Sequence, residues 1–341
     1  MTAEETGALT MSGAAFEAFR KRERGGVLTQ ASIGFTLILL IGLGASVALL
    51  WPVMSEVVSW YMKLLGALPK ASAAPLDPTV PPPVIPPPPA SIFMLIPAYF
   101  LILFFVYVTT AAYEAACLRW MVRGEAGGAF FGLNLSRETW RIYLGYWLWF
   151  CGYFVANYGI QYGALAVGGI IGFAAGALGG GNTAVGMFAG IAGGVIFAIV
   201  GLCIYAWAAV RFAPAAATSV ALRRFAFFDA WRVSKDKFWP MFGSFFLVFL
   251  INFSIILVIE GAAFGLILAQ LWPISSATFA GPALMAVLTR PINIAVLASL
   301  YLIVMIAGWL FYLSMFGINA RVVKIAIQEG RLPEANPSAV F

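Results

Sequence analysis

Six long apolar stretches divide the 341-residue chain, and polar or turn-forming residues separate them. They cover residues 27–54, 92–118, 140–178, 185–210, 238–272 and 292–320. A helix needs about 20 mostly apolar residues to cross a bilayer, so each stretch predicts a transmembrane helix. The third and fifth stretches exceed one crossing, which predicts tilt or a first turn lying in the membrane interface. The pattern therefore predicts an all-α, polytopic integral membrane protein with six transmembrane helices.

Composition agrees with lipid as the surrounding solvent. Hydrophobic residues make up 62% of the chain and charged residues only 10%, whereas about 25% of an ordinary soluble domain is charged. The chain has no histidine, which excludes a Ser-His-Asp or Cys-His catalytic unit and a His-ligated zinc or haem. No nucleotide-binding loop, nucleophile elbow or paired carboxylate motif occurs either. We therefore predict no enzymatic activity, no catalytic residues, no cofactor and no metal site.

The basic residues gather on one side of the predicted membrane domain. Segments 1–26, 119–141, 211–237 and 321–341 hold 17 of the 20 Lys and Arg residues. Because cytoplasmic loops carry an excess of Lys and Arg, both termini are predicted to be cytoplasmic. Residues 1–26 then form a cytoplasmic N-terminal segment, 27–320 the membrane domain and 321–341 a cytoplasmic tail. The net charge of +6 reflects this topology, and nucleic acid is not an expected partner.

A short motif recurs before the odd-numbered helices. Residues 16–20 (FEAFR) precede the first helix, 228–232 (FDAWR) precede the fifth, and a looser version at 132–136 (GLNLS) precedes the third. Each predicts a short amphipathic helix in the membrane interface. Each even-numbered helix also ends with an arginine between apolar neighbours. These features predict internally repeated helix hairpins, which occur in transporters and equally in proteins that only assemble helices.

The cytoplasmic arginines are predicted to contact lipid headgroups. Segment 211–237 alternates basic residues with aromatic ones. That alternation also occurs in proteins that bind single-stranded nucleic acid, but beside membrane helices it favours headgroups. The predicted contacts are Arg119, Arg211, Arg223, Arg224, Arg232 and Arg321.

Glycine recurs every four residues on the third and fourth helices, in a glycine-zipper pattern. The positions are Gly168, Gly172, Gly176 and Gly180, followed by Gly186, Gly190 and Gly194. Spacing of four places each set on one helix face, where the missing side chains let two backbones approach closely. The run at 179–183 (GGGNT) predicts a tight turn. We expect the two helices to pack together as a hairpin, with a glycine-lined subunit interface or pore as the functional alternative.

Two carboxylates lie inside predicted helices, Glu114 and Glu260. Glu114 is close enough to Arg119 to reach an arginine or interfacial water. Glu260 lies deep in the fifth helix, and its candidate partners are Asn252, Tyr301, Tyr312 and Arg290. An acid within a membrane is a functional-site hypothesis by default. For Glu260 the alternatives are proton or cation coupling and a structural hydrogen bond between helices.

The predicted outer loop, 55–91, is long and has a proline-rich core at 81–89 (PPPVIPPPP). Such a run favours extended polyproline II, which serves as a stiff spacer or as a docking strip for aromatic grooves. Before it, residues 56–68 predict a short amphipathic helix on the outer surface.

Residues 200–250 resemble the bacterial membrane domain that is fused to some glycerophosphodiester phosphodiesterases and also occurs as stand-alone proteins. The likeness rests on a helix ending in Arg211, the turn at 214–216 (PAA), the motif at 228–231 and the stretch 234–239 leading into another helix. It implies a location in the bacterial cytoplasmic (inner) membrane. The family's catalytic part is a separate barrel that uses His and acidic residues around a metal, and nothing in this chain corresponds to it.

The sequence favours a non-enzymatic membrane protein: a scaffold or accessory subunit of a membrane complex, or a protein that organises lipids. Its expected partners are membrane lipids and either another membrane protein or a second copy of itself. The alternative is a small transporter or channel that uses Glu260 and the glycine faces.

Overall fold

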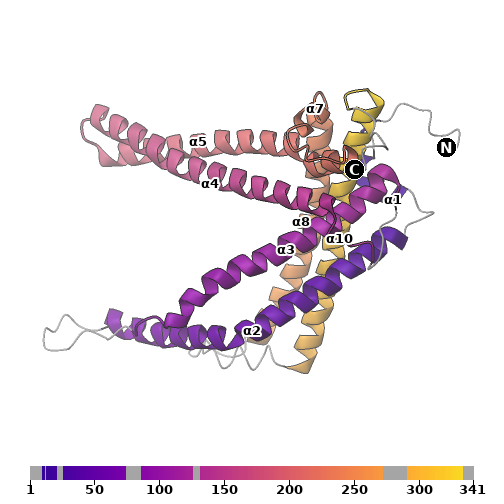
Figure 1. Cartoon of the computed structure of the whole chain (residues 1–341). Helices are drawn as coiled ribbons and strands as arrows, with labels where there is room; N and C mark the ends of the chain where they lie inside the picture. The colour runs from indigo at the N-terminus through magenta and orange to yellow at the C-terminus, as the bar shows by residue number, and fades with distance from the viewer. Residues whose placement is uncertain are drawn as a thin grey trace.

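A computed structural model describes residues 10–11, 13–20, 26–73, 86–125, 131–271 and 290–332, which form helices and their connections without a β-strand (Figure 1). Within these ranges six helices are long and apolar enough to span a membrane, which confirms the predicted six-helix, all-α architecture. They are α2 (Gly26–Ala73), α3 (Leu95–Leu118), α4 (Arg137–Leu178), α5 (Thr183–Phe212), α8 (Phe238–Leu271) and α10 (Pro291–Gln328).

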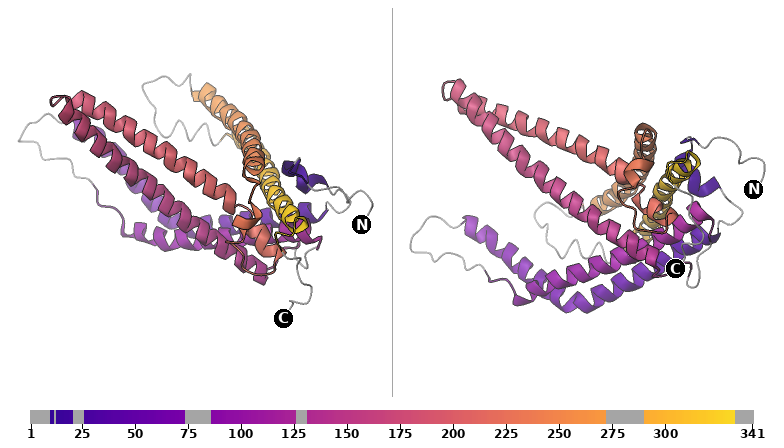
Figure 2. Two further views of the ribbon diagram at one scale, coloured as in Figure 1. Left: turned by 90° about the horizontal axis from the view of Figure 1, so that it is seen from above. Right: turned by 45° about the horizontal axis from the view of Figure 1, so that its top comes forward.

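The long helices form three hairpins, α2–α3, α4–α5 and α8–α10. The hairpins meet at one end and spread apart from it (Figures 1 and 2). Five short elements lie at the end where they meet: η2 (Ala14–Phe16), α1 (Glu17–Arg20), the π-helical turn η5 (Arg119–Arg123), α6 (Ala215–Ala221) and α7 (Ala230–Val233). We call these five elements, with the helix turns that contact them, the joined end.

The buried core lies at the joined end. Its fully buried apolar side chains come from the last turns of α3 and α10, from α6 and α7 and from the first turn of α8, and include Leu118, Val220, Val233, Met241, Val322 and Val323. In contrast, no described residue between 37 and 108 is buried. A helix side exposed to lipid needs no burial because acyl chains are as apolar as leucine.

α6 begins directly after Pro214, since proline at a helix start lacks only an N–H that would have no partner there. Residues 132–136 form no helix, which corrects the third predicted amphipathic helix. Phe131 and Gly132 have φ of 58° and 77° and turn the chain. Ser136 then adopts an extended conformation and caps α4 by accepting a hydrogen bond from the amide of Thr139.

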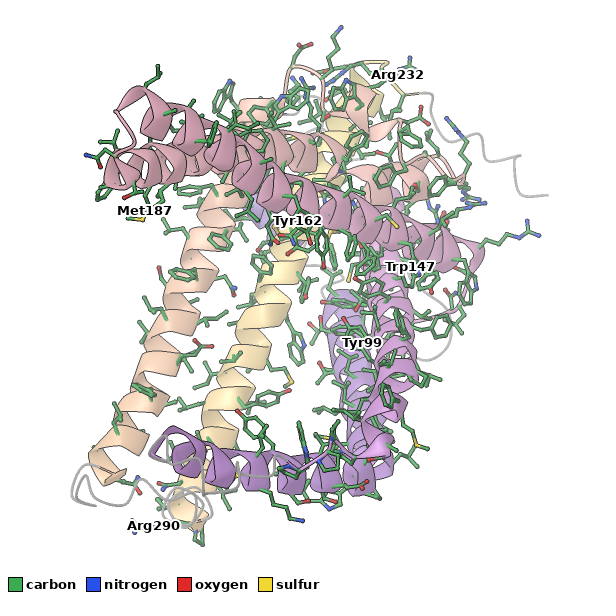
Figure 3. The ribbon with its side chains drawn as sticks, turned by 90° about the vertical axis from the view of Figure 1, so that its left-hand side faces the viewer. Tyr99, Trp147, Tyr162, Met187, Arg232 and Arg290 are labelled. Atoms are coloured by element: carbon green, nitrogen blue, oxygen red, sulfur yellow. The ribbon has the colours of Figure 1, made fainter. Side chains whose placement is uncertain are left out.

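α2 continues to Ala73, so the predicted outer loop starts as helix and the predicted helix at 56–68 is part of α2. Pro52 lies inside α2, and proline in a helix interior removes a hydrogen bond and bends the helix. Figure 3 shows the second part of α2 running crosswise at the end away from the joined end. The indole of Trp60 donates to the carbonyl of Pro86 (Nε1–O, 3.0 Å) and ties this part to the chain before η4 (Ala90–Met94).

The structure describes only part of the predicted proline-rich run and changes the predicted start of the C-terminal tail. Residues 86–89 form no regular secondary structure, and Pro89 has polyproline II angles (φ −65°, ψ 141°), but residues 81–85 of the proline-rich run lie outside the described residues. α10 reaches Gln328, so the predicted tail begins as helix.

Candidate functional site

α4 and α5 pack through six of the seven predicted glycines. A Cβ atom added at Gly172 would lie 2.8 Å from the carbonyl oxygen of Gly186, and one at Gly168 would lie 2.7 Å from that of Gly190. A Cβ at Gly194 would lie 3.0 Å from the carbonyl oxygen of Ala164. Two backbones therefore meet where the sequence lacks side chains, and each glycine face is occupied by the other helix of the same hairpin.

Gly180 does not belong to this packing face, which corrects its prediction. α4 ends at Leu178, and Gly180 and Gly181 have φ of 69° and 85° in the turn that follows. The amide of Gly181 donates to the carbonyl of Gly176 (N–O, 2.9 Å), a capping bond that closes the helix end. A Cβ at Gly180 would meet nothing within 4 Å among the described residues.

Arg119, at the end of α3, holds the segment that leads into α4. Its guanidinium donates to the side chain of Asn134 (Nη1–Oδ1, 2.9 Å) and to the carbonyl of Gly132 (Nη2–O, 3.0 Å). It also pairs with the carboxylate of Glu138 at 3.4 Å. Arg119 is only 6% exposed. It is therefore a buried structural cation, which corrects the prediction that it contacts lipid headgroups.

Arg321, near the end of α10, holds the segment that leads into α2 in the same way. Its Nε donates to the carbonyl of Thr10 (3.0 Å), and its Nη1 lies 3.3 Å from the carboxylate of Glu17. Lys324 pairs with the same carboxylate at 3.0 Å. Arg321 is 8% exposed, so its predicted headgroup contact is corrected as well.

Arg211, at the end of α5, holds the segment that leads into α8. It donates to the carbonyl of Ser234 (Nη1–O, 2.9 Å), and the Ser234 hydroxyl donates back to the carbonyl of Arg211 (2.9 Å). The guanidinium lies over the rings of Trp207 and Trp231, 5.8 and 5.3 Å from their centroids. Thus Arg119, Arg211 and Arg321, which we call the arginine anchors, each connect one hairpin to the segment before another.

The other three arginines are more accessible. Arg223 pairs with Glu125 (2.8 Å) and Arg224 with Asp229 (2.6 Å). Arg232 is exposed at the joined end, and Figure 3 shows it at the opposite end of the molecule from Arg290. Headgroup contact by these three arginines stays a prediction.

Sequence reasoning missed the acids that the buried cations use. Glu138 pairs with both Arg119 and Arg123 (Arg123 Nη1–Oε1, 2.6 Å), and Arg123 also donates to the carbonyl of Val220 (2.7 Å). The available signal was the position of Glu138 in the first turn of α4, where the helix dipole favours an acid.

Acidification is expected to loosen the end of α10. Lys237 pairs with Glu329 (Nζ–Oε1, 2.9 Å), and this hydrogen bond lowers the pKa of Glu329 below its ordinary value. A lowered pKa contributes stability that is present above the unfolded-state value of about 4.3 and is lost as pH falls through the folded-state value. We therefore expect faster amide exchange at residues 329–332 below about pH 4. In Glu329→Gln the exchange rate, corrected for intrinsic chemistry, should be independent of pH in this range; an equal pH response in both proteins would contradict the assignment.

Glu260 is exposed on α8 and forms no hydrogen bond or ion pair with any described residue. Its candidate partners lie elsewhere. Arg290 donates to the side chain of Gln270 (Nη1–Oε1, 3.4 Å), and the Oδ1 of Asn252 has no hydrogen-bond partner among the described residues. The structure therefore does not bring together the site predicted around Glu260.

Glu114 is the buried acid, 5% exposed, and the hydroxyl of Tyr146 donates a hydrogen bond to its carboxylate. Arg119 lies nearby in sequence but directs its guanidinium to residues 132–138. Glu114 has no ion pair within the part of the chain that the structure describes. The predicted link to an arginine is therefore not formed.

Two cavities meet at Glu114 and Tyr146. The larger, about 570 Å³, lies between α3, α4, α5 and α10, and the smaller, about 60 Å³, is lined in part by Arg141 and Ser219 of the joined end. The larger cavity has mostly aromatic walls, formed by Tyr107, Trp149, Phe150, Tyr153, Tyr205, Phe311, Tyr312 and Phe316. A carboxylate and an aromatic wall define the candidate site; no Lys or Arg is among the described residues that line the larger cavity, whereas Arg141 lines the smaller one.

No family model, curated protein or solved structure matches this chain. The resemblance of residues 200–250 to the phosphodiesterase-associated membrane domain therefore stays a prediction.

Proposed function

We propose that this protein is a non-enzymatic scaffold or lipid-organising protein of the bacterial inner membrane, with both termini in the cytoplasm. The observation that supports this function is the shape of the molecule: three hairpins are fastened by buried ion pairs at the joined end and spread apart elsewhere (Figure 1). The joined end carries most of the basic residues, which favour the cytoplasmic side. The spaces between the hairpins open sideways, where lipid or another membrane protein fits.

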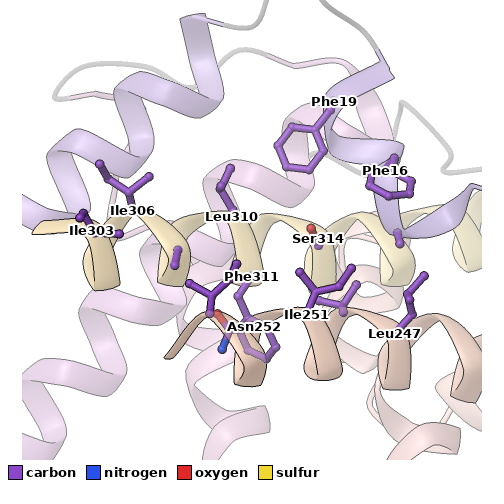
Figure 4. A pocket seen from close by; sticks show the side chains of 14 residues that line it. Phe16, Phe19, Leu247, Ile251, Asn252, Ile303, Ile306, Leu310, Phe311 and Ser314 are labelled. Atoms are coloured by element: carbon purple, nitrogen blue, oxygen red, sulfur yellow. The ribbon is translucent and has the colours of Figure 1, made fainter. Parts of the chain in front are cut away.

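One such space is a groove of about 520 Å³ between the η2–α1 segment and the α8–α10 hairpin (Figure 4). Phe16 and Phe19 stand on one side of it, and Ile251, Ile303 and Leu310 on the other. In water such a groove would collapse or aggregate, whereas in a bilayer acyl chains fill it. Lipid is thus a structural component of the proposed scaffold, and a membrane-protein partner or a second copy would occupy the remaining spaces.

Removing lipid is expected to destabilise the protein. We expect protein extracted in native-lipid discs to retain several lipids per chain by native mass spectrometry. Extensive detergent washing should lower the unfolding midpoint, and added inner-membrane lipid should restore it. A second protein that co-purifies in a fixed ratio in the discs would support the role of an accessory subunit. An unchanged midpoint after complete delipidation, with no bound protein, would contradict it.

A transporter is the second candidate function, and the cavity at Glu114 favours it. We propose Glu114 in place of Glu260 as its coupling acid, because Glu114 faces both an intramembrane cavity and a smaller cavity toward the joined end. The glycine faces have no part in this candidate, since they pack against each other.

A further inference from the structure

The carboxylate of Glu114 is buried and has no positively charged partner among the described residues. An ionised carboxylate buried without a counter-ion is costly, and such groups pair, bind a cation or take up a proton. Tyr146 supplies one hydrogen bond and no charge. Among the described residues Glu114 has no salt bridge: Arg119 is engaged elsewhere, and Arg141, which lines the smaller cavity with Glu114, forms no ion pair with it. The position of Glu114 at the cavity wall therefore leaves room for a cation from outside the chain.

Asn319 points to a ligand independently of Glu114. It lies on α10, lines the same cavity and is only 7% exposed, yet its Oδ1 atom has no hydrogen-bond partner within the described structure. A buried polar atom without a partner costs about 1–3 kcal/mol. Its carbonyl-type oxygen accepts hydrogen bonds, as does the carboxylate. Glu114 on α3 and Asn319 on α10 thus each present an acceptor oxygen to the cavity.

The aromatic residues of the cavity wall favour an organic ammonium group over a metal ion as the ligand. The rings of Tyr107 and Tyr146 meet edge to face at 5.8 Å, and those of Tyr153 and Tyr205 at 6.2 Å, so α3, α4 and α5 share an aromatic surface. Aromatic faces attract organic cations, ammonium groups among them. A small metal ion is disfavoured because Ca²⁺ and Mg²⁺ need about six oxygen ligands, and one carboxylate and one amide supply few.

We propose that this cavity binds an amphiphilic ammonium compound, with its ammonium group beside Glu114 and its apolar body along the aromatic wall. The cavity of about 570 Å³ has the size of a site for a drug-sized ligand. The ammonium group can belong to a lipid headgroup such as phosphatidylethanolamine or to a free amine. This site does not rest on the scaffold function, since loss of binding at Glu114 would leave the lipid-filled spaces between the hairpins unchanged.

Binding of octylammonium, whose N–H groups can donate to Glu114 and Asn319, to the purified full chain in a non-ionic detergent tests the proposal, with 1-octanol as the neutral probe of equal chain length. We expect the cation to bind at least about tenfold more tightly than octanol, as one charge-assisted contact provides. Glu114→Gln should remove that preference. Glu260→Gln makes the same chemical change on an exposed helix face and should keep it.

A second variant tests the site even if Glu114→Gln does not fold. Tyr205→Leu keeps the carboxylate and shortens the aromatic wall, so it should weaken binding of the cation several-fold and leave binding of octanol nearly unchanged. Competition by vesicles of phosphatidylethanolamine, but not of phosphatidylglycerol, would identify a lipid headgroup as the source. Displacement by soluble amines alone would identify a free compound. Equal affinity of the wild-type protein for cation and octanol, or an unchanged preference in folded Glu114→Gln, would overturn the proposal.

Discussion

Replacing Gly172 by leucine is expected to force α4 and α5 apart and to lower the unfolding midpoint by roughly 1–4 °C. A Cβ atom at this position would lie 2.8 Å from the carbonyl oxygen of Gly186 and 3.2 Å from the Cα of Gly190. Both atoms belong to the backbone, so no side chain can rotate away to make room. Overpacking of a tight contact costs about 1–3 kcal/mol, and here it acts on the contact that joins the two helices.

Gly169→Leu is the matched control, since it adds the same side chain to the neighbouring position of the same helix. A Cβ at Gly169 meets nothing within 4 Å among the described residues. Leucine is also a better helix former than glycine by about 0.8 kcal/mol. The unfolding midpoint of Gly169→Leu should therefore equal or slightly exceed that of the wild type. Equal midpoints for the two variants, measured by tryptophan fluorescence in the same detergent, would show that the glycine contact does not hold the hairpin together.

The glycine contact was predictable because it depends on spacing alone. Residues four apart share a helix face in any helix, so Gly168 and Gly172 define a small-residue face without knowledge of the partner. The six helices were predictable for a similar reason, since length and apolarity determine which segments span a bilayer. The end of α4 was predictable as well, since the apolar stretch ends at Leu178 and the run 179–183 predicts the turn that follows. The spacing of four alone misassigned Gly180, which follows the regular spacing while lying in that turn.

The sequence favoured Glu260 as the functional acid, whereas Glu114 is the buried one. The position of a residue within an apolar stretch does not tell which side of the helix faces other helices. Glu260 is deeper in its stretch than Glu114, yet it is exposed. Glu114 lies among Ala111, Ala112, Ala115 and Ala116, all buried. Small residues permit close helix packing, so this alanine-rich run was the signal that marks the interior side. The cavity beside it needs four helices from three hairpins, and no local pattern reports that arrangement.

Replacing Arg119 by methionine is expected to cost about 3–5 kcal/mol of folding free energy, the usual result of removing one partner of a buried ion pair. Methionine keeps much of the length of the side chain but donates nothing. The side chain of Asn134 and the carbonyl of Gly132 would lose their donors, and Glu138 would keep only Arg123. We expect faster amide exchange at residues 132–138 and a lower yield of folded protein.

Arg232→Met is the control for this effect, because it removes the same charge from an exposed position of the joined end. Surface substitutions of this kind usually change stability by about 0.5 kcal/mol or less. Arg119→Lys keeps the charge but lacks the planar fork that reaches two acceptors, so its stability should fall between the wild type and Arg119→Met. If Arg119→Met and Arg232→Met unfold at the same temperature, Arg119 does not fasten the α2–α3 hairpin to the α4–α5 hairpin. The α2–α3 and α4–α5 hairpins would then be joined by the Arg123–Glu138 ion pair and by the apolar core.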